Sequence, residues 1–118
     1  MKAIILIRDE NAARLFERQI QALGNFCDTV VIPDSDRVLQ YLEEQPTDAV
    51  FLDVDGESDW QSICRKVKFA DKRISLVLLS VSPLNAVKAF EAGASDYLPK
   101  PVEREKLERA LGRCRRNG

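Results

Sequence analysis

The sequence has 118 residues, which suits one domain, and 45% of them are hydrophobic, enough to fill a core. The 18 basic and 19 acidic residues give a formal net charge of −1, which offers no electrostatic support for binding nucleic acid or an anionic membrane. Histidine is absent, and this excludes Ser-His-Asp catalysis, Cys-His catalysis and the usual histidine-containing zinc sites.

The cysteines and the apolar runs indicate the cellular compartment in which we expect the chain. Cys27, Cys64 and Cys114 are odd in number and lack CxxC spacing, so we expect reduced thiols on buried faces, with metal binding as the weaker alternative. No apolar run has enough residues to span a bilayer. The first apolar run is too short for a signal peptide, and acidic residues follow it almost directly. We therefore expect a cytoplasmic protein with neither a signal peptide nor a membrane span.

Along the chain, apolar runs typical of buried strands alternate with amphipathic stretches typical of helices. Strands are predicted over residues 4–7, 29–32, 48–53, 74–80 and 96–98. Helices are predicted over residues 12–23, 35–42, 58–67, 83–92 and 102–114. Such an alternation with short connections predicts an α/β fold, a parallel sheet with helices on both faces and right-handed crossovers.

Capping and turn residues mark several helix ends. Asp34 or Ser35 can cap the second helix, and Ser58 or Asp59 the third. Gly24 is a good stop for the first helix. Ser82 can cap the helix over 83–92, which has Pro83 in its first turn and stops at Gly93. This helix is expected to turn its large apolar side chains inward, namely Leu84, Val87 and Phe90.

One domain is predicted over residues 1–118. The composition changes only at residues 113–118, Arg-Cys-Arg-Arg-Asn-Gly, which could be a frayed helix end or the start of a linker. No internal repeat or low-complexity segment is present in the sequence.

Carboxylates follow two of the predicted strands. Asp9 and Glu10 come after the first, Asp53 ends the third, and Asp55 follows it. Because the carboxyl ends of parallel strands meet at one edge, these acids should converge there and repel one another unless a hard divalent cation binds them. Asp9, Asp53 and Asp55 are therefore candidate ligands of such a cation. Asp9 could instead cap the helix that follows it, and a ligand role for the Asp55 side chain is left open.

Further polar residues lie at the same edge: Ser80 ends the fourth strand, Tyr97 lies in the fifth, and Lys100 follows it. Two stretches, Thr-Asp-Ala-Val-Phe-Leu-Asp over 47–53 and Ala-Phe-Glu-Ala-Gly-Ala-Ser-Asp-Tyr-Leu-Pro-Lys-Pro over 89–101, lie in register with the repeated strand and helix pattern. On these residues the chain resembles, over essentially its whole length, the receiver domain of bacterial two-component response regulators.

The resemblance implies a doubly wound sheet of order 2-1-3-4-5 and a phosphorelay signalling role without enzyme activity of its own. It implies that Asp53 is the phosphoacceptor and that Asp9, Asp53 and the main-chain carbonyl of Asp55 bind Mg²⁺. Lys100 and the Ser80 hydroxyl would contact phosphoryl oxygens, and Ser80 with Tyr97 would form the switch. It also implies a cis peptide bond between Lys100 and Pro101.

The resemblance also implies partners. Since the chain has no histidine, the phosphoryl donor would be a sensor histidine kinase or a histidine phosphotransfer protein. An output domain outside this chain is possible, whereas direct binding to nucleic acid or a membrane is not expected. The face formed by residues 83–92, 96–98 and 102–114 would switch and support at most a weak homodimer, through charged residues that include Lys88, Asp96, Arg104 and Arg109.

Three departures lie near the proposed centre. Arg8 stands where most members carry an acid, the loop over 55–58 lacks proline, and Val81 stands where a very small residue is common. Arg8 could pair with Asp53 or swing outward, and we expect it to lie in the pocket and weaken Mg²⁺ binding. The alternative function is a degenerate receiver that acts as a phosphorylation-independent interaction module. A flavodoxin-like nucleotide or flavin binder is disfavoured because no glycine-rich phosphate loop is present.

Overall fold

The computed structural model describes residues 1–24 and 27–117. The strands are β1 (Lys2–Leu6), β2 (Asp28–Val31), β3 (Ala49–Asp53), β4 (Ser75–Ser80) and β5 (Asp96–Pro99). The helices are α1 (Glu10–Gln21), α2 (Ser35–Glu44), α3 (Trp60–Ala70), α4 (Ala86–Glu91) and α5 (Arg104–Asn117). Two short 3₁₀ helices, η1 (Val54–Gly56) and η2 (Pro83–Asn85), follow β3 and β4. The predicted alternation of strands and helices is confirmed.

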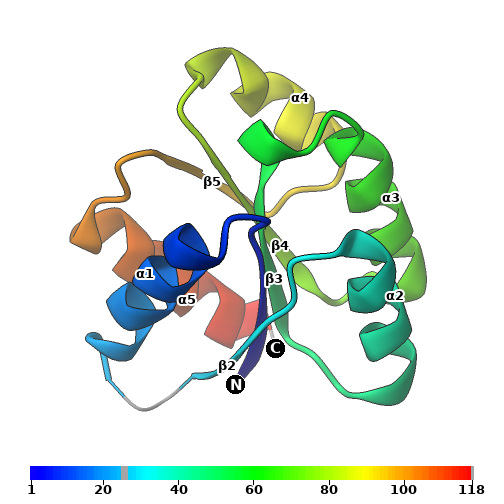
Figure 1. Cartoon of the computed structure of the whole chain (residues 1–118), viewed down its shortest axis with the longest axis horizontal. Helices are drawn as coiled ribbons and strands as arrows, with labels where there is room; N and C mark the ends of the chain where they lie inside the picture. Colours follow the sequence, from blue (N-terminus) through cyan, green and yellow to red (C-terminus); the bar gives the residue numbers. More distant parts are fainter. Residues whose placement is uncertain (25–26, 118) are drawn as a thin grey trace.

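The sheet is parallel, and its order β2-β1-β3-β4-β5 confirms the predicted topology. In Figure 1 the sheet is seen close to edge-on, with α1 and α5 on one side and α2, α3 and α4 on the other. The strand order places β3 between β1 and β4. The carboxyl end of β3 is therefore flanked by the loops that follow both neighbours, which is where open α/β sheets carry their sites.

Alternate side chains of the central strands fill two cores, one on each face of the sheet. Ile5, Phe51 and Val77 pack with α1 and α5, whereas Ile4 and Val50 pack with α2, α3 and α4. Each of these side chains is fully buried, and burial of one such side chain contributes about 1.5–3 kcal/mol. This explains why the central strands read as unbroken apolar runs in the sequence.

The structure shows which of the alternative capping residues occupies the start of each helix. Asp34, not Ser35, caps α2 by accepting a hydrogen bond from the Asp36 backbone N–H at 2.9 Å. Asp59 occupies the cap position of α3 without a side-chain hydrogen bond. The first helix begins at Glu10, earlier than predicted, because Asp9 caps it. At the other end of the chain, α5 continues through residues 113–117, and residue 118 lies outside the described residues.

The predicted orientation of the helix over 83–92 is wrong. The segment divides into η2 and the short α4, and its large side chains are exposed: Leu84 83%, Val87 69% and Phe90 54%. Ala89 and Ala92 face the core instead, because small side chains let this short helix lie close to the sheet. The large residues form an outward stripe at intervals of three.

The turns and thiols behave as the sequence indicates. Gly24 and Gly93 have positive φ angles of 135° and 100°, a conformation that favours glycine at helix ends. Cys27, Cys64 and Cys114 are free and buried, and burial raises the pKa of Cys27 to about 11 and of Cys64 to about 12. Such thiols are poor nucleophiles at neutral pH. Within the described residues, no helix has both the length and the apolar character that a membrane crossing requires.

Candidate functional site

Asp53 and Lys100 meet at the carboxyl edge of the sheet. Asp53 is the last residue of β3, and Lys100 directly follows β5. The Lys100 Nζ lies 2.7 Å from Asp53 Oδ2 and 2.9 Å from Asp55 Oδ2. Although partial burial acts to lower it, the ion pairs with these two carboxylates hold the pKa of Lys100 above its ordinary value. The predicted meeting of Asp53 and Lys100 at this edge is confirmed, and so is the cis bond between Lys100 and Pro101.

The Asp55 side chain turns toward the end of β4. Its Oδ1 accepts a hydrogen bond from the Ser80 hydroxyl at 2.7 Å, and its Oδ2 accepts one from the Val81 backbone N–H at 2.9 Å. Partial burial acts to raise the pKa of Asp55, but Lys100, Ser80 and the Val81 N–H together lower it. Asp55 is therefore held as an anion within a network of donors.

Ser80 and Tyr97 are joined through residue 82. The buried Ser80 hydroxyl oxygen accepts hydrogen bonds from the Ser82 backbone N–H at 3.1 Å and from Asn85 Nδ2 at 3.4 Å. The Tyr97 hydroxyl donates to the Ser82 carbonyl. Sequence reasoning missed Ser82 and Asn85 as members of this network, although a cluster of small polar residues directly after a buried strand was a usable signal.

Asp9 is a helix cap that also faces the site. Its Oδ1 accepts a hydrogen bond from the Ala12 backbone N–H at 3.1 Å, so the capping alternative is confirmed. A cleft of about 350 Å³ lies at this edge of the sheet, lined by Ile7, Arg8, Asp9, Asp53 and Gly56. Capping and facing the cleft are compatible, because a carboxylate has about four acceptor sites and the cap uses one.

Three clustered carboxylates, one form of the predicted metal site, are not found. Among the described residues, no group of three or more His, Cys, Asp or Glu side chains is arranged to hold a metal ion. The reason is that Asp55 points to Ser80 and Lys100, so the carboxylates that line the cleft within the described part of the chain are those of Asp9 and Asp53. Mg²⁺ is commonly bound by one or two carboxylates with water or phosphate oxygens completing its shell, so this donor set still fits.

Arg8 lines the cleft as expected, but its partner is Glu57 and not Asp53. The guanidinium makes a bidentate pair, with Nε 3.1 Å from Glu57 Oε1 and Nη2 2.8 Å from Glu57 Oε2. The hydrogen bonds with Glu57 raise the pKa of Arg8. The Glu57 carboxylate is only 7% exposed, whereas the Arg8 side chain is 65% exposed. The sequence signal that was missed is Glu57, an acidic residue four positions after Asp53 that could neutralise the unusual Arg8.

Comparisons with known proteins agree with this geometry. The family model for the response regulator receiver domain matches residues 4–112. The DNA-binding response regulator MtrA of Mycobacterium tuberculosis is 31% identical over 121 residues, which cover 99% of this chain and 53% of that protein. The sensory transduction protein LytT of Oceanobacillus iheyensis is 29% identical over 119 residues, which cover 96% of this chain and 48% of that protein. The chain thus spans about half the length of these relatives.

A solved structure shows the same fold. The receiver domain of the sensor histidine kinase PA1611 from Pseudomonas aeruginosa, described with a magnesium ion in its active-site cleft, aligns with a TM-score of 0.81 at 23% identity. The alignment covers 95% of this chain and 94% of that one. Together with the sheet order and the match over residues 4–112, these findings identify the chain. It belongs to the response regulator receiver domain family of two-component systems.

Proposed function

We propose that this chain is a phosphoacceptor module in which Asp53 takes a phosphoryl group from a partner, with Mg²⁺ held by Asp9, Asp53 and the main-chain carbonyl of Asp55. The observation that carries the proposal is the contact of 2.7 Å between Lys100 Nζ and Asp53 Oδ2 at the carboxyl end of β3. The Asp53 side chain is 15% exposed, so it is sheltered but open to the cleft.

The chemistry is a displacement at phosphorus. A carboxylate oxygen of Asp53 forms a bond to phosphorus as the bond from phosphorus to the donor nitrogen breaks, and the imidazole nitrogen keeps that electron pair. Lys100 already contacts Asp53 and is placed to pair with the anionic phosphoryl oxygens. When bound, Mg²⁺ would neutralise further charge on those oxygens.

The donor is expected to be a phosphohistidine on another protein. The sequence contains no histidine, so the chain cannot supply this group itself. A sensor histidine kinase or a histidine phosphotransfer protein meets the requirement. An output domain is a further expected partner, because the relatives are about twice as long as the part that matches this chain.

The switch would start at Ser80. Its hydroxyl now donates to Asp55 and accepts from the segment that carries η2. If the hydroxyl turns to a phosphoryl oxygen on Asp53, these contacts change, and the segment from Ser82 to α4 is released from its present position. Tyr97 holds the same segment through the Ser82 carbonyl, so it would respond to the change. The stripe affected carries exposed apolar side chains, namely Val81, Leu84, Val87 and Phe90.

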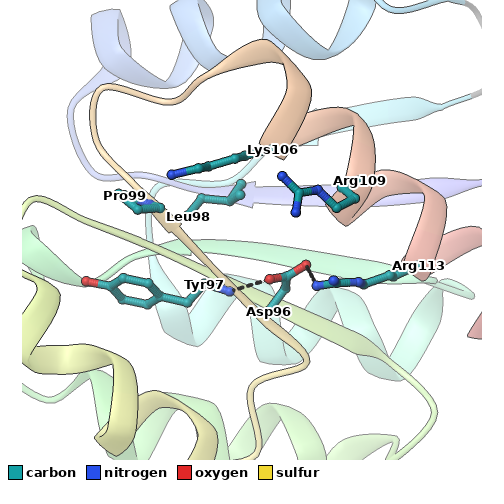
Figure 2. Close-up of a pocket in the computed structure, with 7 residues that line it drawn as sticks. All are labelled: Asp96, Tyr97, Leu98, Pro99, Lys106, Arg109 and Arg113. Carbon is teal, nitrogen blue, oxygen red and sulfur yellow. Dashed lines mark hydrogen bonds and ion pairs between the residues drawn. The ribbon is translucent and has the colours of Figure 1, made fainter.

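The neighbouring face of β5 and α5 gives only weak support to a homodimer. Figure 2 shows Arg113 pointing to Asp96, and the two side chains form an ion pair of 2.8 Å. Arg104 likewise pairs with Glu108 on its own helix at 3.1 Å. Asp96 and Arg104, two of the four charged residues named for this face, are therefore already engaged within one chain. Since exposed pairs contribute about 0–1 kcal/mol each, we expect any dimer through this face to be weak before phosphorylation.

The test is phosphorylation by a small-molecule phosphodonor, followed by intact mass in Mg²⁺ and in EDTA. We expect a gain of one phosphoryl group in Mg²⁺ only. The variant Asp53→Asn should gain none, whereas Asp59→Asn, which removes an exposed loop carboxylate, should behave as the wild type. Absence of any gain at saturating Mg²⁺ would favour the degenerate receiver instead.

A further inference from the structure

Phe69, in the last turn of α3, is the most exposed large hydrophobic side chain of the described residues, at 94%. Single exposed apolar residues are common on protein surfaces, so exposure alone assigns no role. An aromatic ring can, however, bury about 150–250 Å² when a partner covers it. The surroundings of Phe69 therefore decide its meaning.

Phe69 borders an apolar groove between two neighbouring helices. Figure 1 shows α2 and α3 next to each other on one face of the sheet. The groove between them has a volume of about 640 Å³. Its apolar lining comes from Leu39, Leu42, Phe69 and Ala70, and its charged lining from Glu43, Arg65 and Lys66. A protruding ring and an apolar hollow thus lie on the same surface.

The charged residues of the groove have opposite signs on its two sides. Glu43 belongs to α2, and Arg65 and Lys66 belong to α3. Within the described part of the chain, none of these three side chains makes an ion pair, unlike Arg8 with Glu57. One helix therefore offers a negative side chain and the other offers positive ones, all available to a partner.

We propose that this α2–α3 groove is a homodimer interface whose occupant is a second copy of this chain. A two-fold interface needs one surface that complements itself. Here a two-fold axis can place each Phe69 ring in the groove of the other copy, and Glu43 opposite Arg65 and Lys66. An aromatic anchor surrounded by a charged rim is the usual composition of such contacts. The net charge of −1 creates little repulsion between copies.

The groove lies away from the phosphoacceptor site. Phe69 and Ala70 end α3 just before β4 begins at Ser75, so they stand near the amino edge of the sheet, whereas Asp53 ends β3 at the carboxyl edge. Association through the groove would leave Asp53 accessible to its donor. The proposal goes beyond phosphorylation, and we expect the dimer to form with or without a phosphoryl group.

The dimer should be weak, because one ring and a few aliphatic side chains from each copy form a contact at the small end of specific interfaces. We expect a dissociation constant on the order of 100 µM. Sedimentation equilibrium from about 10 µM to about 1 mM would span this value. Phe69→Asp should weaken association by about tenfold or more, because it removes the central anchor. Its exposure means that the fold should tolerate the change, which thermal unfolding would verify.

A matched control and a charge swap make the test specific. Leu15→Asp changes another exposed apolar residue, 60% exposed, on α1, which lies on the other side of the sheet (Figure 1), and should leave association unchanged. Glu43→Lys and Lys66→Glu should each weaken it, and the double variant should recover it. A chain that stays monomeric to about 1 mM, or a dimer lost in Leu15→Asp but kept in Phe69→Asp, would overturn the proposal. Phe69→Asp should still be phosphorylated, so a failure here is distinct from a failure of the phosphoacceptor role.

Discussion

The pair of Arg8 and Glu57 makes a sharp prediction about Mg²⁺ affinity. Arg8 introduces a positive charge beside Asp9 and Asp53, but the bidentate contact with Glu57 neutralises it locally. Without Glu57, the positive charge of Arg8 would act on the cleft unopposed. Without Arg8, the negative charge of Glu57 would do so. We therefore expect Glu57→Gln to weaken Mg²⁺ binding, Arg8→Gln to tighten it, and the double variant to resemble the wild type.

The size of the effect follows from Coulomb's law. A unit charge and a divalent cation about 8 Å apart, which is one Debye length at physiological salt, interact by about 1 kcal/mol in water before screening. Since about 1.4 kcal/mol corresponds to tenfold, each single variant should shift the Mg²⁺ dissociation constant by about two- to fivefold, in opposite directions. The shifts should shrink as salt is added.

Trp60 provides the assay. It is the first residue of α3, a few residues beyond Asp55 and Gly56, so its fluorescence should report Mg²⁺ entering the cleft. Titrations at low and high salt would give the Mg²⁺ affinities of the four proteins, namely the wild type, the two single variants and the double variant. Arg14→Gln, which breaks an exposed pair with Glu17 on α1, is the control and should leave the affinity unchanged.

A second readout separates charge from structural damage. Arg8→Gln leaves the buried Glu57 carboxylate without its partner, which should destabilise the fold by about 1–3 kcal/mol even while Mg²⁺ binding tightens. If both single variants weaken Mg²⁺ binding, or if the double variant is as weak as Glu57→Gln, the pair acts through loop structure and the electrostatic reasoning is wrong.

Two further predictions concern stability. Gly93→Ala should lower the free energy of unfolding in urea by more than about 1 kcal/mol, because φ is 100° and the added Cβ would lie 3.1 Å from Lys68 Cγ. Gly112→Ala in α5 should instead stabilise the fold by up to about 1 kcal/mol, because its new Cβ would meet nothing within 4 Å beyond its chain neighbours and the nearby backbone of its own helix. The raised pKa of Lys100 contributes stability that is present below its ordinary pKa of 10.5 and is lost as pH rises above that value. The lowered pKa of Asp55 contributes stability that is present above its ordinary pKa of 3.8 and is lost as pH falls below it. Lys100→Ala should flatten the alkaline loss, and Asp55→Asn the acid loss; unchanged pH profiles in both variants would contradict the importance of this network.

The parallel sheet and the meeting of its strand-end residues at one edge could be predicted from local signals, whereas the strand order and the placing of Lys100 beside Asp53 came from the resemblance to the receiver family. Buried strands give unbroken apolar runs, and a parallel sheet brings their carboxyl ends together whatever the details of packing. The cap made by Asp9 was one of two alternatives, and the structure shows that the residue caps α1 while it faces the cleft.

The failures arose where the outcome depends on contacts between distant segments. The helix over 83–92 has large apolar residues at regular spacing, yet its alanines are the residues that pack against the core. Their small side chains let α4 lie close to the sheet. The choice of Glu57 as the partner of Arg8 depends on the relative positions of two loops. The direction of Asp55 depends on donors from β4 and the loop after β5. Periodicity in one segment carries no information on such pairings.

The central claim is that Asp53 is the phosphoacceptor, and locating the phosphoryl group tests it most directly. After treatment with a phosphodonor in Mg²⁺, borohydride reduces an aspartyl phosphate to homoserine, which tandem mass spectrometry can assign to a residue. We predict a single modified position, Asp53, with the signal lost in EDTA and strongly reduced in Lys100→Ala. Modification at Asp9, Asp55 or Glu57, or none at saturating Mg²⁺, would contradict the account.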